Sequence, residues 1–188
     1  MQQSNYEKLI CYKQITLNNQ GKLTFFVDKH STKEGTWGVL QINTGIIDFI
    51  FLDGEGNELF KQRLDQTNPK IQIPPASWHK IQPISDEFSA ALDFYCQPHR
   101  YFNKKYGLGN VHSDLYYIYK TYFPQNTPLN ILDIGCGSGR NLFYLALCKH
   151  HITGIDIKDV VLQQIETINQ KEKFANIKLI QHDLNQQL

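Results

Sequence analysis

The feature that most constrains the fold is residues 131–141, with the sequence ILDIGCGSGRN. An apolar run contains Asp133, and glycines then alternate with other residues at positions 135, 137 and 139. Directly after them, apolar residues at 142, 145 and 146 share one face of a helix. This order predicts a strand, a tight turn and a helix, which is how nucleotide-binding α/β units begin.

Two further acids follow predicted strands of the same half. Asp156 ends the apolar run 152–155, about 20 residues past the first glycine, where such units usually hold a ribose. Asp183 follows a third run, 177–181, and a helical pattern over 159–173 lies between the second and third runs. Strands that alternate with helices predict a parallel sheet, and these acids would lie at its carboxyl edge.

The turn departs from the dinucleotide-binding pattern G-x-G-x-x-G. Its third glycine comes one place early, and Arg140 stands where that pattern has glycine. Asp133 lies two residues before the first glycine, and a carboxylate attracts a ligand's ammonium group but repels a diphosphate. The turn therefore suits a cationic amino-acid nucleoside better than a dinucleotide. A glycine-rich loop of some other α/β protein is the alternative.

The N-terminal half has an all-β pattern. Short runs of β-branched and aromatic residues alternate with turns, and residues 53–57, DGEGN, are a strong hairpin signal. We expect a small sandwich or barrel with strands at 23–27, 36–43, 46–52, 58–64, 70–73, 79–84 and 88–95. The boundary near Gln97-Pro98 gives a β domain over 1–98 and an α/β domain over 99–188. The latter opens with a short helix over 99–106 and a helix over 114–122 that Ser113 caps.

Composition narrows the choice of partners. The formal net charge is +1, so bulk charge favours neither nucleic acid nor an acidic membrane. No apolar run approaches the roughly 18 residues of a membrane span, and the N-terminus lacks the apolar stretch of a secretory signal. The four cysteines are far apart, which is typical of reduced thiols inside cells. We expect a cytoplasmic protein with no nucleic-acid or membrane partner.

Residues 132–141 resemble motif I of the class I S-adenosylmethionine (SAM)-dependent methyltransferases. The whole chain is similar to the N-terminal part of the two-domain tellurite-resistance methyltransferases, the TehB family. Five further stretches carry this resemblance, and they are LICYKQ at 9–14, GTWG at 35–38, WHK at 78–80, FYC at 94–96 and YFNKKY at 101–106. The fold it implies is a cupin-like β domain followed by the first half, strands 3-2-1 only, of a Rossmann-like methyltransferase sheet.

The resemblance also implies a role for each matching residue. Asp133 and the glycine turn would face the methionine portion of SAM, Asp156 the ribose, and Asp183 the adenine amino group. The implied cofactor-binding set is Asp133, Gly135, Cys136, Gly137, Gly139, Arg140, Asn141, Asp156, Ile157, Asp183 and Leu184, with Tyr106, His112 and Ser113 from a covering segment. Simple hydrophobic contact is an equal alternative for Tyr106, and a solvated position before the helix for His112.

The implied activity is methyl transfer to a small oxyanion such as tellurite or selenite, for detoxification. A sulfonium is already an activated methyl donor, so such an enzyme mainly aligns the two reactants and excludes water. The sequence nominates no general base, and the catalytic residues are left unknown.

The β half offers a second functional hypothesis, a non-catalytic module that binds a metal or an oxyanion. His30, Glu34 and His79 are candidate ligands for a divalent metal, because cupin-type barrels hold metals with histidines and a glutamate. The usual His-x-His pair is absent. Histidines that are simply buried or hydrogen-bonded are therefore the preferred interpretation, and we predict no metal.

The resemblance further implies that the sheet is incomplete. The family's sheet continues beyond its third strand, whereas this sequence ends soon after the third run. We expect an N-terminal fragment that binds SAM weakly or not at all and is inactive alone. The first strand would then have an open edge, through which the chain could associate with itself.

Overall fold

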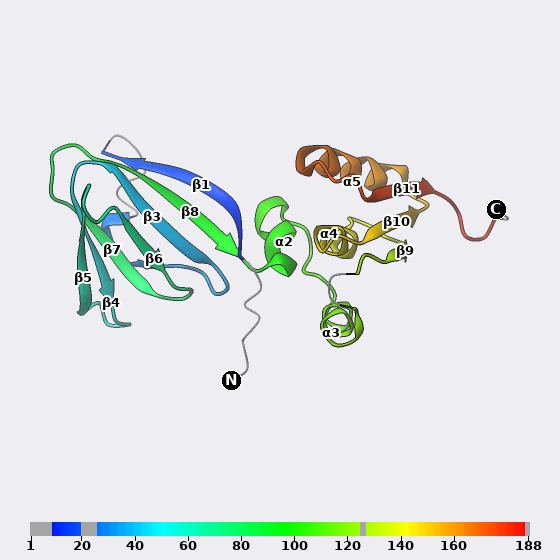
Figure 1. Ribbon diagram of the computed structural model, residues 1–188, viewed down its shortest axis with the longest axis horizontal. Helices are drawn as coiled ribbons and strands as arrows, with labels where there is room; N and C mark the ends of the chain where they lie inside the picture. Colours follow the sequence, from blue (N-terminus) through cyan, green and yellow to red (C-terminus); the bar gives the residue numbers. More distant parts are fainter. Residues whose placement is uncertain (1–8, 20–25, 125–126, 187–188) are drawn as a thin grey trace. The chain divides into compact units, whose positions relative to one another are not determined.

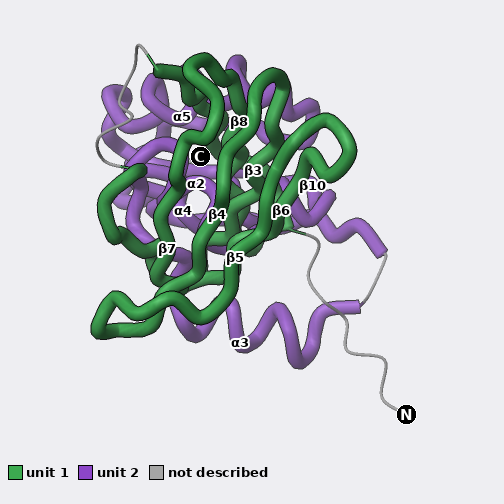
Figure 2. Tube along the Cα trace, turned by 90° about the vertical axis from the view of Figure 1, so that its left-hand side faces the viewer, with its two compact units in different colours: residues 1–97 green, residues 98–188 purple. Residues whose placement is uncertain are grey.

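A computed structural model describes residues 9–19, 26–124 and 127–186. The chain divides into two compact units, residues 1–97 and 98–188, which are treated separately below (Figures 1 and 2). No helix among the described residues is long and apolar enough to cross a membrane.

Unit 1 consists of two four-stranded antiparallel sheets. One has the order β1-β8-β3-β6, with β1 at Ile10–Asn18, β8 at Ser89–Cys96, β3 at Trp37–Thr44 and β6 at Lys70–Ile73. The other has the order β2-β7-β4-β5, with β2 at His30–Ser31, β7 at Trp78–Pro83, β4 at Ile47–Leu52 and β5 at Glu58–Leu64. Side chains from both sheets form one apolar core, including Leu40, Phe49, Ile81 and Leu92. The predicted β-rich half is thus confirmed.

The hairpin between β4 and β5 has the turn that its sequence predicts. The carboxylate of Asp53 accepts the backbone N–H groups of Glu55, Gly56 and Asn57 at 2.9, 2.7 and 2.8 Å. Gly56 has φ 99°, a conformation that side chains with a Cβ rarely adopt. One carboxylate and one glycine therefore fix the reversal between the two strands.

The first predicted strand of unit 1 was misplaced. Of the expected strand 23–27, residues 23–25 lie outside the described residues, and Phe26 and Val27 are helical. The strand that pairs with β8 is instead β1, which the sequence analysis missed. The β1–β8 register shifts between Cys11 and Lys13, and this irregularity breaks the regular alternation by which a strand is recognised.

Unit 2 is an α/β unit with a parallel sheet, as predicted. After a short 3-10 turn, Pro98–Arg100, come the helices α2 at Tyr101–Tyr106 and α3 at Ser113–Tyr122. Then follow β9 at Asn130–Ile134, α4 at Arg140–Leu147, β10 at His151–Asp156, α5 at Asp159–Glu172 and β11 at Ile177–Gln181. The three strands are parallel in the order β11-β10-β9.

Two helix positions differ from the predictions. The expected helix over 99–106 is divided into the 3-10 turn and α2. Helix α3 begins one residue earlier than predicted, so that Ser113 is its first helical residue and His112 is its N-cap. The His112 ring takes the capping role because its Nδ1 accepts the N–H of Asp114 at 3.3 Å.

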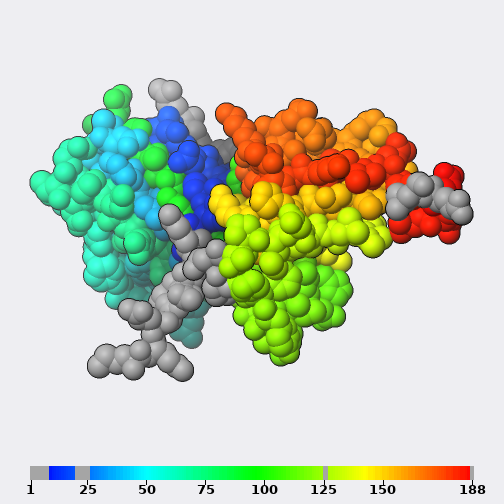
Figure 3. Space-filling model, turned by 45° about the vertical axis from the view of Figure 1, so that its right-hand side comes forward, coloured from blue at the N-terminus to red at the C-terminus, as the bar shows by residue number. Residues whose placement is uncertain are grey.

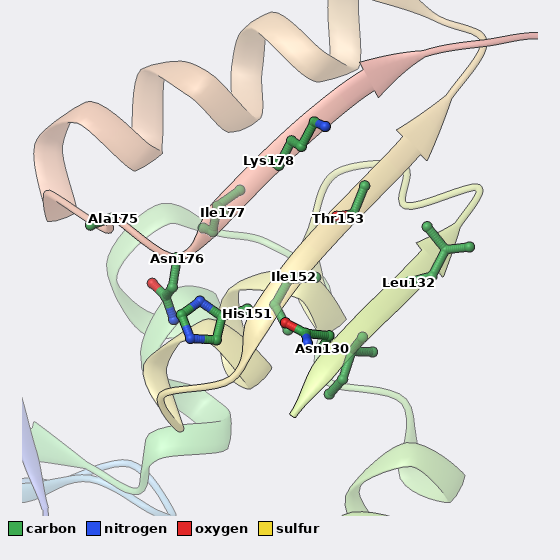
Figure 4. A pocket seen from close by; sticks show the side chains of 10 residues that line it. Asn130, Leu132, His151, Ile152, Thr153, Ala175, Asn176, Ile177 and Lys178 are labelled. Atoms are coloured by element: carbon green, nitrogen blue, oxygen red, sulfur yellow. The ribbon is translucent and has the colours of Figure 1, made fainter. Parts of the chain in front are cut away.

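Among the described residues of unit 2, helices cover one face of the sheet and leave the other uncovered. Helices α4 and α5 bury apolar side chains on the covered face, and a Cβ added to Gly154 would lie 2.5 Å from Leu142 Cδ1. Leu132, Thr153 and Lys178 occupy matched positions of the three strands on the other face (Figure 4). Leu132 is 54% exposed, and the next outward residue of β9, Ile134, is 57% exposed. β9 also forms an edge of the sheet.

Candidate functional site

The carboxyl ends of β9, β10 and β11 meet at one edge of the parallel sheet, the usual place for a ligand in such sheets. The turn after β9 needs glycine at three positions, because Gly135, Gly137 and Gly139 have φ values of 69°, 52° and 79°. At Gly139 a Cβ would also lie 3.0 Å from Ile165 Cγ1 and 3.1 Å from Phe143 Cε2. The glycines that the sequence singled out are therefore required by the backbone.

Backbone hydrogen bonds hold this turn against β10 and α4. The N–H groups of Gly135 and Cys136 both donate to Ile155 O, at 2.8 and 3.0 Å. Gly139 donates to Cys136 O at 2.9 Å and is the N-cap of α4. The first N–H groups of α4 have no partner within the helix and carry its positive dipole end, so they are available to a polar ligand at the turn.

Asp156, at the end of β10, joins its own strand end to the glycine turn. Its Oδ2 accepts the N–H of Gly137 at 3.0 Å, and its Oδ1 accepts the N–H of Lys158 at 2.9 Å. The backbone hydrogen bond from Lys158, followed by that from Gly137, lowers the pKa of Asp156 below its ordinary value. The carboxylate is therefore ionised and fixed in position before any ligand arrives.

Asp133 is in a different environment. Its Oδ2 is sealed from solvent and makes no hydrogen bond to any described residue, and burial raises the pKa of this carboxyl group. Within residues 127–186 neither Asp133 nor Asp156 forms an ion pair with a basic side chain. Burial, with the charges of Asp133 and Asp156, raises the pKa of the Cys136 thiol to about 11. The site thus has two acids and a thiol that stays protonated, and an electropositive ligand would balance it.

A hollow of about 260 Å³ opens at this edge. Five of the residues that the resemblance implies line it, namely Gly135, Asp156, Ile157, Asp183 and Leu184. Ile155, His182 and Asn185 complete its lining. The sequence analysis missed His182, although it directly precedes Asp183, and its N–H donates to Asp156 O at 3.1 Å.

A larger hollow, about 350 Å³, lies on the bare face of the sheet (Figure 4). It contains no acid, and its lining is Asn130, Ile131, Leu132, His151, Ile152, Thr153, Ala175, Asn176, Ile177 and Lys178. The smaller hollow is the better candidate, because it combines the glycine turn with two carboxyl groups at the strand ends.

The side chains of Arg140 and Asn141 contact a neighbouring chain segment. Arg140 Nη1 donates to Asn110 O at 3.3 Å, and Asn141 Oδ1 accepts the N–H of His112 at 3.0 Å. Both residues border the turn, as the resemblance implies, but the protein itself supplies these partners. Because Asn110 and Arg140 are distant in sequence, no local pattern could have predicted the contact.

Tyr106 points to another part of unit 2. Its hydroxyl donates to the carboxylate of Glu172, at the end of α5 opposite to Asp156. Tyr101 and Lys105 donate to the same carboxylate at 3.1 and 2.8 Å. Burial, together with Glu172, raises the pKa of Tyr106 to about 12. This phenol therefore anchors α2 to the C-terminal end of α5, and it does not line the hollow.

In unit 1, two of the three candidate metal ligands form a pair. His30 and His79 lie opposite each other on β2 and β7, with ring centroids 4.3 Å apart. Each Nδ1 lies 2.9 Å from the backbone oxygen two residues earlier, that of Asp28 or Ser77. Among the described residues no group of three or more potential metal ligands lies together, so Glu34 is not grouped with the two histidines.

Comparisons with known proteins agree for both halves. The profile of the family described as "Tellurite resistance protein TehB" matches residues 94–188, and that of the "TehB-like domain" matches residues 19–92. The chain is 35% identical over 182 residues to "Probable S-adenosyl-L-methionine-dependent methyltransferase TehB" of Haemophilus influenzae strain 10810. The same protein of strain Rd is 34% identical. Each match covers 95% of this chain and 61% of the relative.

A solved structure is similar over nearly the whole chain. The crystal structure of TehB from Haemophilus influenzae superimposes with a TM-score of 0.86 at 32% identity. The match covers 94% of this chain and 60% of that one. This chain therefore spans about three fifths of the length of the relatives that it matches.

Proposed function

The chain belongs to the TehB family of tellurite resistance proteins, and we propose that unit 2 provides the SAM-binding part of a methyltransferase that acts on small oxyanions such as tellurite or selenite. The observation that carries the proposal is the arrangement at the strand ends. There the Asp156 carboxylate accepts a hydrogen bond from the glycine turn and borders a hollow that Asp183 also lines. The relatives named as probable SAM-dependent methyltransferases support the same cofactor.

The residues present suit this cofactor. Each Asp156 oxygen already accepts one N–H group and has a further lone pair for a ribose hydroxyl. Ile157 and Leu184, each more than half exposed, would lie against the adenine, and Asp183 would accept its amino group. The buried, unpartnered oxygen of Asp133 offers an acceptor to the ammonium of the methionine portion. A positive ligand would balance both acids.

Bound SAM would supply an activated methyl group on a cationic sulfur. The residues of this chain would then bind and orient the donor and keep water from it, which is where most of the rate gain of such a transfer arises. A lone pair on tellurium or selenium needs no deprotonation before it attacks a methyl group. We assign no general base.

We further propose that β9, β10 and β11 are strands one to three of a Rossmann-like class I methyltransferase sheet, and that unit 1 is a cupin-like barrel. In this proposal the 188 residues alone bind SAM more weakly than the longer H. influenzae relative and transfer no methyl group. The bare sheet face supports this, because parallel sheets are normally covered on both faces. The exposed edge of β9 would also allow self-association.

Calorimetric titration with SAM, at ligand concentrations up to the millimolar range, tests the cofactor assignment. Asp156→Ala removes charge-assisted hydrogen bonds worth about 1.5–3 kcal/mol, which corresponds to about a 10- to 100-fold loss of affinity. Asp159→Ala is the matched control, because Asp159 is an exposed acid nearby. Its carboxylate accepts a hydrogen bond from the side chain of Gln163. Equal affinity of Asp156→Ala and the wild-type chain would contradict the ribose assignment.

A further inference from the structure

The segment between α2 and α3, residues 107–112, lies against the first turn of α4. It starts at Gly107, which ends α2 in a left-handed conformation with φ 71°. At Gly109 the backbone approaches α4 so closely that an added Cβ would lie 3.3 Å from Arg140 Cδ. The segment forms no helix or strand, so contacts with its neighbours must set its position.

Two side chains of α4 and one of α2 hold this segment by its backbone, and the one from α2 is Asn103, whose Nδ2 donates to Leu108 O at 2.7 Å. Asn141 Oδ1 accepts the N–H of His112, and Arg140 Nη1 donates to Asn110 O. His112 is in turn the N-cap of α3, because its ring accepts the N–H of Asp114. The amide of Asn141 is therefore hydrogen-bonded to the residue that caps α3.

Helix α3 is at most partly buried along its whole length. No residue of this helix is fully buried, and Tyr117, Ile118 and Tyr122 are exposed. Figure 3 shows the yellow-green segment that contains α3 at the surface. The ring contacts of α3 come from Tyr116 and Tyr119. The Tyr116 ring centroid lies 4.3 Å from that of His99, and the Tyr119 ring centroid lies 5.6 Å from that of His150. A hydrogen bond to the N-cap is therefore expected to matter more here than in a helix with a buried face.

Asn141 is also close to the glycine turn of the candidate site. Gly139, the last glycine of the turn, is the N-cap of α4, and Arg140 and Asn141 follow it directly. Any shift of segment 107–112 is therefore a shift relative to the glycine turn. The hollow lined by Asp156 and Asp183 lies at the ends of β10 and β11, whereas this segment contacts the start of α4, which follows β9.

We infer that Asn141 is a positioning residue, which holds segment 107–112 beside the glycine turn of the proposed cofactor site. The inference rests on the proposed function, since it needs SAM to lie at the turn. It assigns to Asn141 a structural link between cofactor binding and the order of segment 107–112, and not a direct contact with the cofactor. Ligand binding should then slow amide hydrogen exchange in this segment, and the effect should depend on the acceptor at position 141.

The test compares Asn141→Ala, Asn141→Asp and the wild-type chain by titration with S-adenosylhomocysteine and by hydrogen exchange with and without it. Asn141→Ala should weaken binding about fivefold, the value of one ordinary hydrogen bond. It should also speed exchange in residues 107–112 of the free protein and abolish their protection by the ligand. Asn141→Asp, whose carboxylate accepts the same N–H, should restore both. Gln163→Ala, which removes an exposed amide elsewhere on a helix, should match the wild type.

Two results would overturn the inference. One is an Asn141→Ala variant with wild-type affinity, and the other is unchanged exchange in residues 107–112 of that variant. If the wild-type chain binds no S-adenosylhomocysteine, the cofactor proposal fails and the coupling fails with it. The exchange of the free proteins would still show whether Asn141 anchors the segment, so the two failures can be told apart.

Discussion

The two units of this chain bury apolar surface in different ways. In unit 1 each sheet covers the inner face of the other, and the core draws on both. In unit 2 the helices α4 and α5 cover one face of the sheet, while Leu132 and Ile134 stay exposed on the other. Unit 1 is thus closed around its core, whereas unit 2 has an open face beside a polar site. We therefore expect the free energy of unfolding to depend mainly on the closed core of unit 1. We expect ligand binding to depend on the strand ends of unit 2.

The largest expected effect concerns the closed core. Phe49 is 1% exposed and belongs to the core that side chains of both sheets form, so Phe49→Ala should lower the free energy of unfolding of unit 1 by about 3–5 kcal/mol. Both tryptophans of the chain, Trp37 and Trp78, lie in unit 1, so tryptophan fluorescence during urea unfolding reports on this unit. Circular dichroism at 222 nm follows mainly the helices of unit 2. A loss below about 1 kcal/mol would show that the core can collapse around the missing ring.

The second expected effect is a pH dependence of the stability of unit 1. Burial, with the charge of His30, lowers the pKa of His79 from 6.5 to about 4. The folded protein keeps this ring neutral, while the unfolded chain binds a proton below about pH 6.5. The unfolded state therefore binds more protons between these values, and stability falls as pH falls from about 6.5 to about 4. The full loss is about 3 kcal/mol.

Urea midpoints from tryptophan fluorescence at several pH values measure this slope. His79→Gln cannot titrate and should reduce this slope, and the remainder includes the contribution of His30, whose pKa burial also lowers. Should that variant fail to fold, the ring resonances of His79 in NMR spectra of the wild-type chain give the answer directly. A ring that is already charged at pH 5 would contradict the assignment.

The sequence predicted the fold of unit 2 better than its contacts. The glycine turn was predictable because its glycines have positive φ, and glycine is the residue type that adopts this conformation readily. The carboxylate of Asp156 could be placed at the strand ends because parallel strands bring their carboxyl ends together. By contrast, the partners of Asn141 and Tyr106 come from other elements, and only the folded chain reveals them. Local patterns therefore predict where a site lies, and tertiary contacts decide what each side chain does there.

The difference between local patterns and tertiary contacts also explains why the sequence analysis missed β1 and misassigned the N-cap of α3. β1 was missed because its register shift near Cys11 interrupts the alternation that marks a strand. The N-cap of α3 was assigned to Ser113 on residue preference, whereas the neighbouring His112 is held by Asn141 and takes that place. In both cases a tertiary contact or an irregular pairing outweighed the local preference.

The smallest expected effect tests whether the bare face of unit 2 is bare in solution. Leu132 is 54% exposed, so Leu132→Ala should change the free energy of unfolding by no more than about 0.5 kcal/mol, the range for a surface position. Circular dichroism in urea measures this, and light scattering over a range of protein concentrations measures association. If the exposed apolar side chains of β9 drive self-association, the variant should shift the monomer–oligomer equilibrium toward monomer. A loss of 2 kcal/mol or more, as for core residues, would instead mean that Leu132 is buried in solution, and the contrast between the two units would then fail at this face.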